Sequence, residues 1–453
     1  MPYENIKHAG DPFHRFAVPL PLRGRLLWLL LSQQNKLCKK KGTFPLTYKT
    51  ILVINTMHIG DLLLITPALR TLRTNFPDAK ITLLTDKSLA DLVRENPCID
   101  ECLTIDKHGR DKSFGALVRF IRRLRSRKFD LVMNLHRNER CSAITAFCGA
   151  KKRIGYAQPG FGIFYTKKYP NLAMADTPKE LATKHQVTVH LEMLQKALNL
   201  KTIDDRGLEM KIPDAAEQEA ARIWQQMLDE TAKATKTTER NAATDVDTSS
   251  TTTNSVAARP VIAFNIGASW ATKRWIDTYF AQCADTFIKE GYAVAFFGGP
   301  TDVPIVDACL AQMKENGSPH CHVFTGKVSL AVLAGLFARC AVLLTTDSGP
   351  MHIGVSQNVP VVTMFGASPV PTFYPYDARA ILYKTPEPCH PCGIHDCPKK
   401  GADHMACMKH IPVATVMEGV HELLKKYEGK AARDLPRENA DAKGSHACRI
   451  VAL

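Results

Sequence analysis

The residues of this chain that are best suited to chemistry follow short apolar runs. Gly60 and Asp61 come shortly after residues 51–54, at a point where glycine permits close backbone approach and a helix N-terminus favours a carboxylate. Asp61 could therefore belong to a ligand site, because ligands of doubly wound sheets bind at the carboxyl ends of the strands. From the spacing alone, a carboxylate that merely caps the helix is the more frequent case.

Two later loops have the composition of anion-binding sites. Lys273 lies in G-A-S-W-A-T-K-R-W after the apolar run 261–266, and T-D-S-G-P-M-H begins just after the apolar run 341–345. Backbone N–H groups at the start of a helix can hold a phosphate, and Asp347 or Ser348 can hydrogen-bond a sugar or a base. A solvated lysine and an N-capping turn with a packed His352 are the alternatives that these segments leave open.

Four cysteines are concentrated in one Pro/Gly-rich segment: Cys389, Cys392, Cys397 and Cys407. A C-x-x-C pair with two further thiols could hold a structural zinc ion in a tetrahedral site. Reduced thiols packed in a loop are the alternative, because the spacing is not that of a standard zinc ribbon.

The elements that must position these residues alternate between strand and helix, which is typical of parallel sheets covered by helices. In such sheets ligands bind beyond the carboxyl ends of the strands, where Asp61, Lys273 and Asp347 are expected. The predicted strands are 51–54, 81–85, 103–105, 131–135, 261–266, 293–297, 341–345 and 361–365. The predicted helices are 60–76, 114–127, 213–228, 277–289, 304–313, 330–338 and 411–427.

Composition divides the chain into five parts. Residues 230–258 are rich in Thr and Ser and contain almost no bulky apolar residue, so they cannot bury enough surface to offset their ordering entropy. The predicted parts are 1–48, a basic and apolar extension; 49–212, a Rossmann-like domain; 213–258, a helix plus a disordered insert; 259–427, a second Rossmann-like domain; and 428–453, a disordered tail.

Charge and cysteine usage narrow the class of protein. The 59 Lys and Arg residues exceed the 44 Asp and Glu residues, for a net charge of +15. This excess favours an anionic membrane or a phosphorylated substrate, because no nucleic-acid-binding signature accompanies it. Fourteen scattered cysteines indicate a reducing compartment.

Membrane attachment is expected to be peripheral. No apolar run near the start approaches the ~20 residues of a spanning helix, and the order of a secretory signal is missing. The extension 1–48 could lie on an anionic membrane or dock on the first domain as an amphipathic helix.

Residues 58–73, H-I-G-D-L-L-L-I-T-P-A-L-R-T-L-R, resemble the opening of the lipopolysaccharide heptosyltransferases, and T-D-S-G-P-M-H-I-G at 346–354 is similar to that family's most distinctive block. The likeness covers most of residues 51–420. It implies an α/β protein of GT-B architecture, with two doubly wound Rossmann-like domains facing across a cleft.

The resemblance also implies roles for matching residues. Asp61 corresponds to the catalytic base of the family. The residues that this likeness assigns to the ADP-heptose donor are Lys273, Trp275, Asp347, Ser348, Gly349 and His352. We expect the acceptor to contact His58, Gly60, His136 and Arg137. No cofactor is expected for catalysis, and any zinc at the cysteines would be structural.

We therefore expect an inverting glycosyltransferase that moves a heptose from ADP-L-glycero-D-manno-heptose to the lipid A–Kdo inner core of lipopolysaccharide. It would be cytoplasmic and peripheral on the inner face of the cytoplasmic membrane. A nicotinamide-dependent oxidoreductase would need G-x-G-x-x-G where the chain has N-T-M-H-I-G-D. The open alternatives are a non-catalytic nucleotide-sugar-binding protein of the same fold and a GT-B transferase with another nucleotide sugar.

Overall fold

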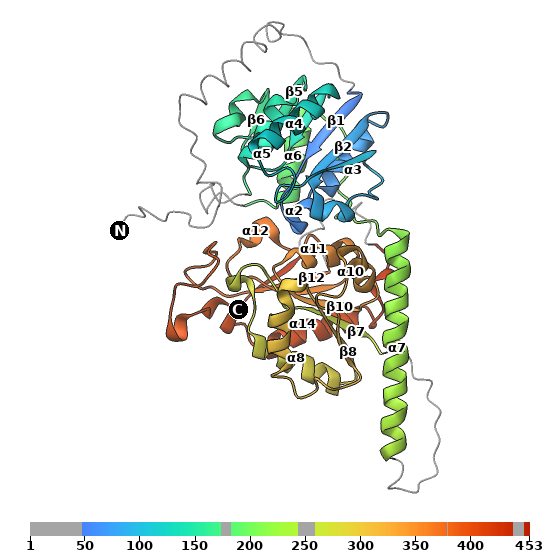
Figure 1. The fold of residues 1–453 in the computed structure, drawn as a ribbon. Coiled ribbons are helices and arrows are strands. Elements are labelled where there is room, and N and C mark those ends of the chain that lie inside the picture. The colour runs from blue at the N-terminus through green and yellow to red at the C-terminus, as the bar shows by residue number, and fades with distance from the viewer. Residues whose placement is uncertain (1–47, 174–182, 243–258, 378, 438–447) are drawn as a thin grey trace. The chain divides into compact units, whose positions relative to one another are not determined.

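The computed structural model describes residues 48–173, 183–242, 259–377, 379–437 and 448–453. All of them belong to one compact unit, Tyr48–Leu453, which is organised around two parallel sheets (Figure 1). The predicted extension lies outside the described residues, apart from Tyr48 at its end.

The first sheet is parallel throughout and has the strand order β3-β2-β1-β4-β5-β6. Its described strands are β1 (Thr50–Ile54), β2 (Lys80–Asp86), β3 (Glu101–Ile105), β4 (Leu131–Asn134), β5 (Lys152–Tyr156) and β6 (Lys167–Tyr169). Ile51 and Val53 of β1 pack in one apolar cluster, whereas Leu52 and Ile54 pack in another. The strand is continuously apolar because both faces of the sheet are covered.

Helices cover both faces of this sheet. One face carries α2 (Ile59–Leu63), α3 (Thr66–Asn75), α6 (Gln186–Leu198) and the 3₁₀ turn η2 (Lys87–Leu92). The other carries α4 (Phe114–Ser126), α5 (Glu139–Phe147) and the 3₁₀ turn η3 (Gly160–Phe164). The single helix predicted for residues 60–76 is wrong. It divides because Pro67, in the first turn of α3, has no N–H to continue the ladder from α2.

The second sheet is also parallel and has the order β13-β12-β11-β10-β7-β8-β9. Its described strands are β7 (Val261–Asn265), β8 (Ala293–Phe297), β9 (Cys321–Val323), β10 (Val342–Thr346), β11 (Val361–Met364), β12 (Ala380–Lys384) and β13 (Arg449–Ala452). The prediction that the tail is disordered is wrong for its last residues, which form β13. Ile450 and Val451 of this strand pair with β12. These β-branched side chains suit an edge strand.

The second sheet also has helices on both faces. One face carries α8 (Asp277–Lys289), α9 (Val303–Leu310) and α14 (Val413–Lys426), and the other carries α10 (Leu330–Phe337) and α11 (Gly349–Ser356). The remaining elements are α12 (Val370–Phe373), α13 (Ala406–Lys409) and the 3₁₀ turns η5 (Ala271–Lys273), η6 (Pro300–Asp302), η7 (Gly401–Asp403) and η8 (Ala432–Asp434).

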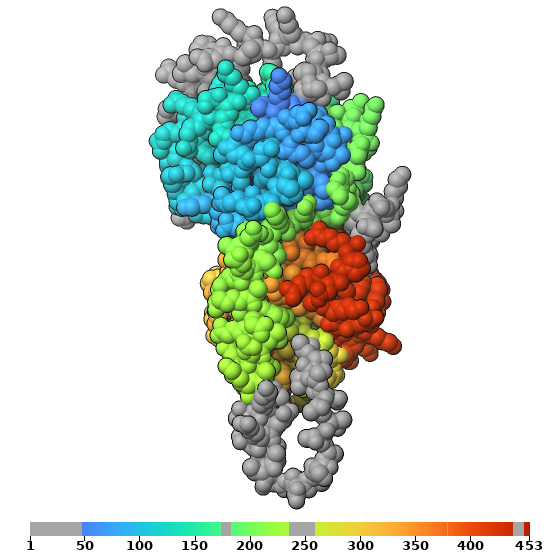
Figure 2. All heavy atoms as spheres, turned by 90° about the vertical axis from the view of Figure 1, so that its right-hand side faces the viewer, coloured from blue at the N-terminus to red at the C-terminus, as the bar shows by residue number. Residues whose placement is uncertain are grey.

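Helix α7 (Asp214–Ala242) connects the two sheets in sequence and packs against α10. It forms a yellow-green ridge on the surface in Figure 2. The helix extends well past the predicted end at residue 228, partly because the Thr231 hydroxyl bonds to the carbonyl oxygen of Pro319 (3.1 Å). Residues 243–258 of the predicted insert lie outside the described residues.

Both sheets confirm the doubly wound prediction. The order of strands reverses between β1 and β4 in the first sheet and between β7 and β10 in the second. Ligands of such sheets bind in the crevice beyond the carboxyl ends of the strands at this switch point. The loops after β1, β4, β7 and β10 are therefore the ones that position a site, and they carry nearly all of the candidate residues.

Candidate active site

Asp61 lies in α2, directly beyond the carboxyl end of β1. The Asn55 side chain stabilises the turn that precedes Asp61. The side-chain amide of Asn55 donates to the Asp61 carbonyl oxygen (3.2 Å), and the side-chain oxygen of Asn55 accepts from the Met57 N–H (3.0 Å). The Asp61 side chain is 17% exposed and lies 3.6 Å from Nδ1 of His58, which is 87% exposed. The carboxylate is therefore recessed but open to solvent.

The environment of Asp61 favours its ionised form. Burial acts to raise the pKa of this carboxyl, but the hydrogen bond with His58 holds the pKa below its ordinary value. Helix α2 begins after His58, and no side chain caps it. Asp61 is thus not used as the helix cap and is available at neutral pH to accept a proton.

His136 follows β4, the neighbour of β1, at the same edge of the first sheet. Its Nδ1 lies 3.0 Å from Oγ1 of Thr56, and its Nε2 lies 2.9 Å from the side-chain amide of Asn138. Burial lowers the pKa of His136 to about 3, so the ring is neutral at pH 7. Arg137 is the next residue and is half-buried at this edge.

Two residues that the sequence analysis did not single out complete this edge. Lys107 donates to the carbonyl oxygen of Thr56 (2.9 Å) and pairs with Asp86 (3.3 Å). Asp86 ends β2 and Lys107 closely follows β3. Their positions at the ends of predicted strands were the signal that would have found them.

Lys273 ends η5 in the loop after β7. Its Nζ lies 3.0 Å from Oδ2 of Asp347, and the two side chains are 19% and 5% exposed. The same Nζ lies 4.8 Å from the centre of the Trp270 ring. An ion pair with this little exposure is held more firmly than a surface pair. Lys273 is therefore not the solvated lysine of the alternative interpretation.

Asp347, Ser348 and Gly349 form the turn between β10 and α11. Oγ of Ser348 accepts a hydrogen bond from the side-chain amide of Asn265 at the end of β7 (2.8 Å). Because Ser348 is engaged there, no side chain caps the start of α11. A helix N-terminus without a side-chain cap is the arrangement in which proteins hold phosphate groups.

His352 of α11 connects the two edges. It is 4% exposed, and a Cβ atom at Gly60 would lie only 2.7 Å from its Cδ2. Burial lowers the pKa of His352 to about 4, while Asp347 and Asp61 act in the opposite direction. One neutral imidazole thus lies within electrostatic reach of both carboxylates, and only glycine at position 60 permits this packing.

Trp275 does not join the site. It is 2% exposed and its Nε1–H donates to the Ile411 carbonyl oxygen (3.2 Å). Its ring makes edge contacts with Tyr279 and Phe280. This corrects the expectation that Trp275 contacts the donor, because its indole is committed to the hydrophobic core, whereas Trp270 lies beside Lys273.

The zinc expectation is also corrected. Among the residues that the structure describes, no group of three or more His, Cys, Asp or Glu side chains is arranged to hold a metal ion. Burial, followed by the neighbouring thiols of the cluster, raises the pKa of Cys407 to about 11.

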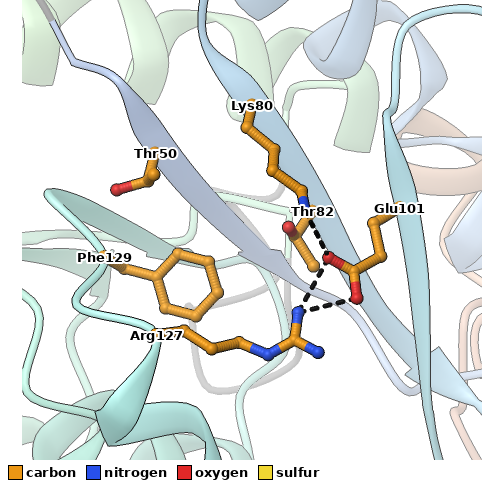
Figure 3. Close-up of a pocket in the computed structure, with 6 residues that line it drawn as sticks. All are labelled: Thr50, Lys80, Thr82, Glu101, Arg127 and Phe129. Atoms are coloured by element: carbon orange, nitrogen blue, oxygen red, sulfur yellow. Dashed lines mark hydrogen bonds and ion pairs between the residues drawn. The ribbon is translucent and has the colours of Figure 1, made fainter.

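A pocket elsewhere in the first sheet is not part of this site. Figure 3 shows it lined by Thr50, Lys80, Thr82, Glu101, Arg127 and Phe129. Glu101 there pairs with Lys80 (3.2 Å) and Arg127 (2.7 Å). Thr50, Lys80 and Glu101 begin their strands, so the pocket lies at the amino edge, opposite Asp61.

In the part of the chain that the structure describes, no helix combines the length and apolar character that a membrane crossing needs.

Known proteins resemble this chain over most of its described length. It is 24% identical over 382 residues to lipopolysaccharide heptosyltransferase 2 of Salmonella typhimurium, which covers 83% of this chain and 99% of that protein. It is 30% identical over 169 residues to lipooligosaccharide heptosyltransferase 2 of Haemophilus influenzae, covering 37% of this chain and spanning about half, 48%, of that relative.

Two solved structures share the fold. A crystal structure of a family 9 glycosyl transferase from Veillonella parvula matches with a TM-score of 0.67 and 29% identity, over 85% of this chain and all of that one. The ADP-heptose LPS heptosyltransferase II of E. coli matches with a TM-score of 0.62 and 20% identity, over 84% and 99%. The GT-B architecture is thereby confirmed.

The sequence profile of Glycosyltransferase family 9 (heptosyltransferase) matches residues 117–402, which is more than half of the chain. This segment includes the loops that hold Lys273 and Asp347 and ends within the cysteine-rich region. Together with the switch-point site on each sheet, the match establishes that the chain is a glycosyltransferase and belongs to family 9, the heptosyltransferases.

Proposed function

We propose that this protein transfers a heptosyl group from ADP-L-glycero-D-manno-heptose to a hydroxyl of the lipopolysaccharide inner core, with inversion at the anomeric carbon. The observation that carries the proposal is the position of His352, whose imidazole lies near both Asp61 and the Lys273–Asp347 pair. A proton acceptor and an anion-binding loop therefore converge on one place, as a displacement of a nucleotide requires.

The reaction is a single displacement. Asp61 takes the proton of an acceptor hydroxyl while that oxygen bonds to the anomeric carbon, and the bond from this carbon to the β-phosphate oxygen of ADP breaks with its electron pair. The lowered pKa of Asp61 keeps it ionised but makes it a weak base. Proton transfer therefore accompanies attack instead of preceding it.

Groups at the carboxyl edge of the second sheet stabilise the negative charge that develops on ADP. Lys273 supplies a positive charge, and the start of α11 supplies backbone N–H groups that favour a phosphate. Binding of the diphosphate competes with Asp347 for the Lys273 ammonium, which lies 3.0 Å from that carboxylate. Ser348, Gly349 and His352 would line the donor, and His58, Gly60, His136 and Arg137 the acceptor.

The acceptor is carried by a membrane lipid, and α4 offers a surface for it. The helix contains four arginines and no acidic residue. Phe114, at its start, is 68% exposed, and Ile163 of η3 is 64% exposed. Arginines beside exposed apolar side chains suit an anionic membrane surface, to which each basic residue contributes about 1 kcal/mol. We propose peripheral attachment to the inner face of the cytoplasmic membrane through this surface, aided by residues 1–48.

A turnover assay tests the transfer. The purified chain is incubated with ADP-heptose and a heptose-less inner-core acceptor, and both ADP release and the mass of the acceptor are followed. We expect one heptose per acceptor, and no transfer from UDP- or GDP-sugars. Transfer from one of those sugars and not from ADP-heptose would overturn the donor assignment.

Vesicle co-sedimentation tests the membrane surface. Binding to anionic vesicles should weaken with salt and fall when Arg119, Arg122 and Arg125 are replaced by Gln, because the attraction is electrostatic. The control variant replaces Lys289 and Lys314 by Gln. These two lysines are exposed and lie in the half of the protein that contains the second sheet. Equal loss in both variants would mean that net charge, and not α4, governs binding.

A further inference from the structure

The segment between β12 and α13, here termed the Cys/His-rich loop (residues 385–405), takes no part in the site described above. It is nevertheless fastened to the carboxyl edge of the second sheet. The Gly393 N–H donates to the Ala367 carbonyl oxygen (2.9 Å), and the His390 ring hydrogen-bonds the Gly366 carbonyl oxygen. Both acceptors directly follow β11, so the loop lies at the edge where the donor is expected.

The Cys/His-rich loop also contacts the loop that carries Lys273. The backbone N–H of Thr272 donates to the carbonyl oxygen of His395 (3.2 Å), and the Thr272 hydroxyl donates to that of Ile394. The Trp270 and His395 rings stack, with centroids 4.1 Å apart and an interplanar angle of 29°. Backbone and side-chain contacts of Trp270 and Thr272 thus join the two loops just before Lys273.

Trp270 in turn contacts the Lys273 ammonium, which lies 4.8 Å from its ring centre and 3.0 Å from the Asp347 carboxylate. An aromatic face attracts a cation and restricts where a flexible lysine places its charge. The chain of contacts runs from His395 through Trp270 to Lys273. It begins at an exposed residue and ends at a nearly buried charge.

We propose that His395 is a positioning residue for the nucleotide-sugar donor: by stacking on Trp270 it fixes the ring against which Lys273 lies, and so holds the ammonium where the diphosphate binds. This rests on the proposed role of Lys273. It also gives a role to the attachment of the Cys/His-rich loop at this edge.

The exposed position of His395 makes the proposal testable without unfolding the protein. The side chain contributes little to the core, and the two hydrogen bonds from Thr272 go to backbone carbonyl oxygens of the loop. Substitution at position 395 therefore removes the stacking contact but keeps those bonds. His404 provides a matched control, because it is an exposed histidine of the same loop whose ring bonds only to the Lys399 carbonyl oxygen among the described contacts.

The experiment measures ADP affinity by calorimetry and donor KM and kcat by turnover. His395→Ala should weaken ADP binding roughly 2- to 5-fold, the range of an exposed cation–π contact, and raise the donor KM by a similar factor. His395→Phe should restore both, because Phe can stack on Trp270. His404→Ala should leave both values and the melting temperature unchanged.

A second pair of variants separates this proposal from the function on which it rests. In a Lys273→Ala background, His395→Ala should have no further effect on ADP affinity. A full additional loss there, or failure of Phe to rescue, would overturn the positioning role. If Lys273→Ala alone leaves ADP affinity unchanged, the assignment of the donor loop fails instead.

Discussion

The two sheets each place an aspartate beyond a central strand, and the two aspartates have opposite surroundings. Asp61 of the first sheet lies 3.6 Å from the exposed imidazole of His58, whereas Asp347 of the second sheet lies 3.0 Å from an ammonium and is 5% exposed. A carboxylate fixed to an ammonium is poorly placed to accept a proton, while one beside imidazoles is free to do so. The same residue type, placed beyond a switch-point strand of each sheet, therefore has two different environments.

The difference extends to the neighbouring charges. Burial lowers the pKa values of His136 and His352 around Asp61, so both rings are neutral at pH 7 and neither forms a fixed ion pair with this carboxylate. On the second sheet Lys273 is the charged group, and it pairs with Asp347 in the turn before α11, where the helix N-terminus favours an anion. The comparison supports the proposal that proton transfer occurs at one edge and charge stabilisation at the other.

Removing the basicity of Asp61 should have the largest effect. Asp61→Asn keeps the size of the side chain, so turnover should fall roughly 100-fold or more with ADP affinity nearly unchanged. Asp78→Asn, at an exposed aspartate of the same half, is the control for turnover. Near-normal turnover of Asp61→Asn would contradict the assignment of Asp61 as the general base.

Breaking the ion pair on the second sheet should affect binding first. Lys273→Ala should weaken ADP binding roughly 10- to 100-fold, because a charge-assisted contact to phosphate is lost, and Asp347→Ala should also weaken it because Lys273 loses its anchor. Calorimetry with ADP measures both, with the exposed Lys289→Ala as control. Unchanged affinity in both site variants would mean that the nucleotide binds elsewhere.

The packing that joins the two edges can be tested at Gly60. A methyl group there would lie 2.7 Å from Cδ2 of His352, so Gly60→Ala should destabilise the protein by about 1–3 kcal/mol and lower turnover. Gly115→Ala in α4 meets only the flexible Arg119 side chain and should be neutral or slightly stabilising. Denaturant unfolding compares the two, and equal stability would show that α2 and α11 tolerate separation.

The buried imidazoles predict that the free energy of unfolding decreases in acid. Burial holds the pKa of His136 near 3 and those of His190 and His352 near 4, below the ordinary 6.5, so the unfolded chain binds more protons between these values. Stability should therefore fall as pH drops from 6.5 towards 4, by up to about 1.4 kcal/mol per pH unit for each histidine. Urea titrations at several pH values measure this slope, which His190→Phe should reduce. A slope unaffected by that change would contradict the assignment.

The smallest effect is expected at the insert. Replacing residues 243–258 by a short Gly/Ser linker should leave the melting temperature and activity close to wild type, because loop length enters stability only logarithmically. The cut starts after α7, since Thr231 bonds to Pro319. Loss of folding would show that the replaced segment contributes packing of its own.

Much of the fold was predictable because its signals are local. Strand β8 and helix α8 have the bounds predicted from their apolar patterns, and Asp61, Lys273 and Asp347 were predicted as site residues because each follows a strand. The edge strand β3 was predicted in part, but the edge strands β6, β9 and β13 were not. Strand β6 reads Lys-Lys-Tyr, and an edge strand can be polar because it is not buried on every side. Its existence depends on pairing with a neighbour, which no local pattern encodes.

The sequence by itself determined the order of strands and helices, the switch-point loops and the residue types in them, because periodicity, glycine and proline act within a few residues. Only the tertiary structure decided that Trp275 belongs to the core while Trp270 contacts Lys273, that His352 packs on Gly60, and that Asp61 and Asp347 have different partners. Burial and charge arise from residues distant in sequence, and these set what each side chain can do.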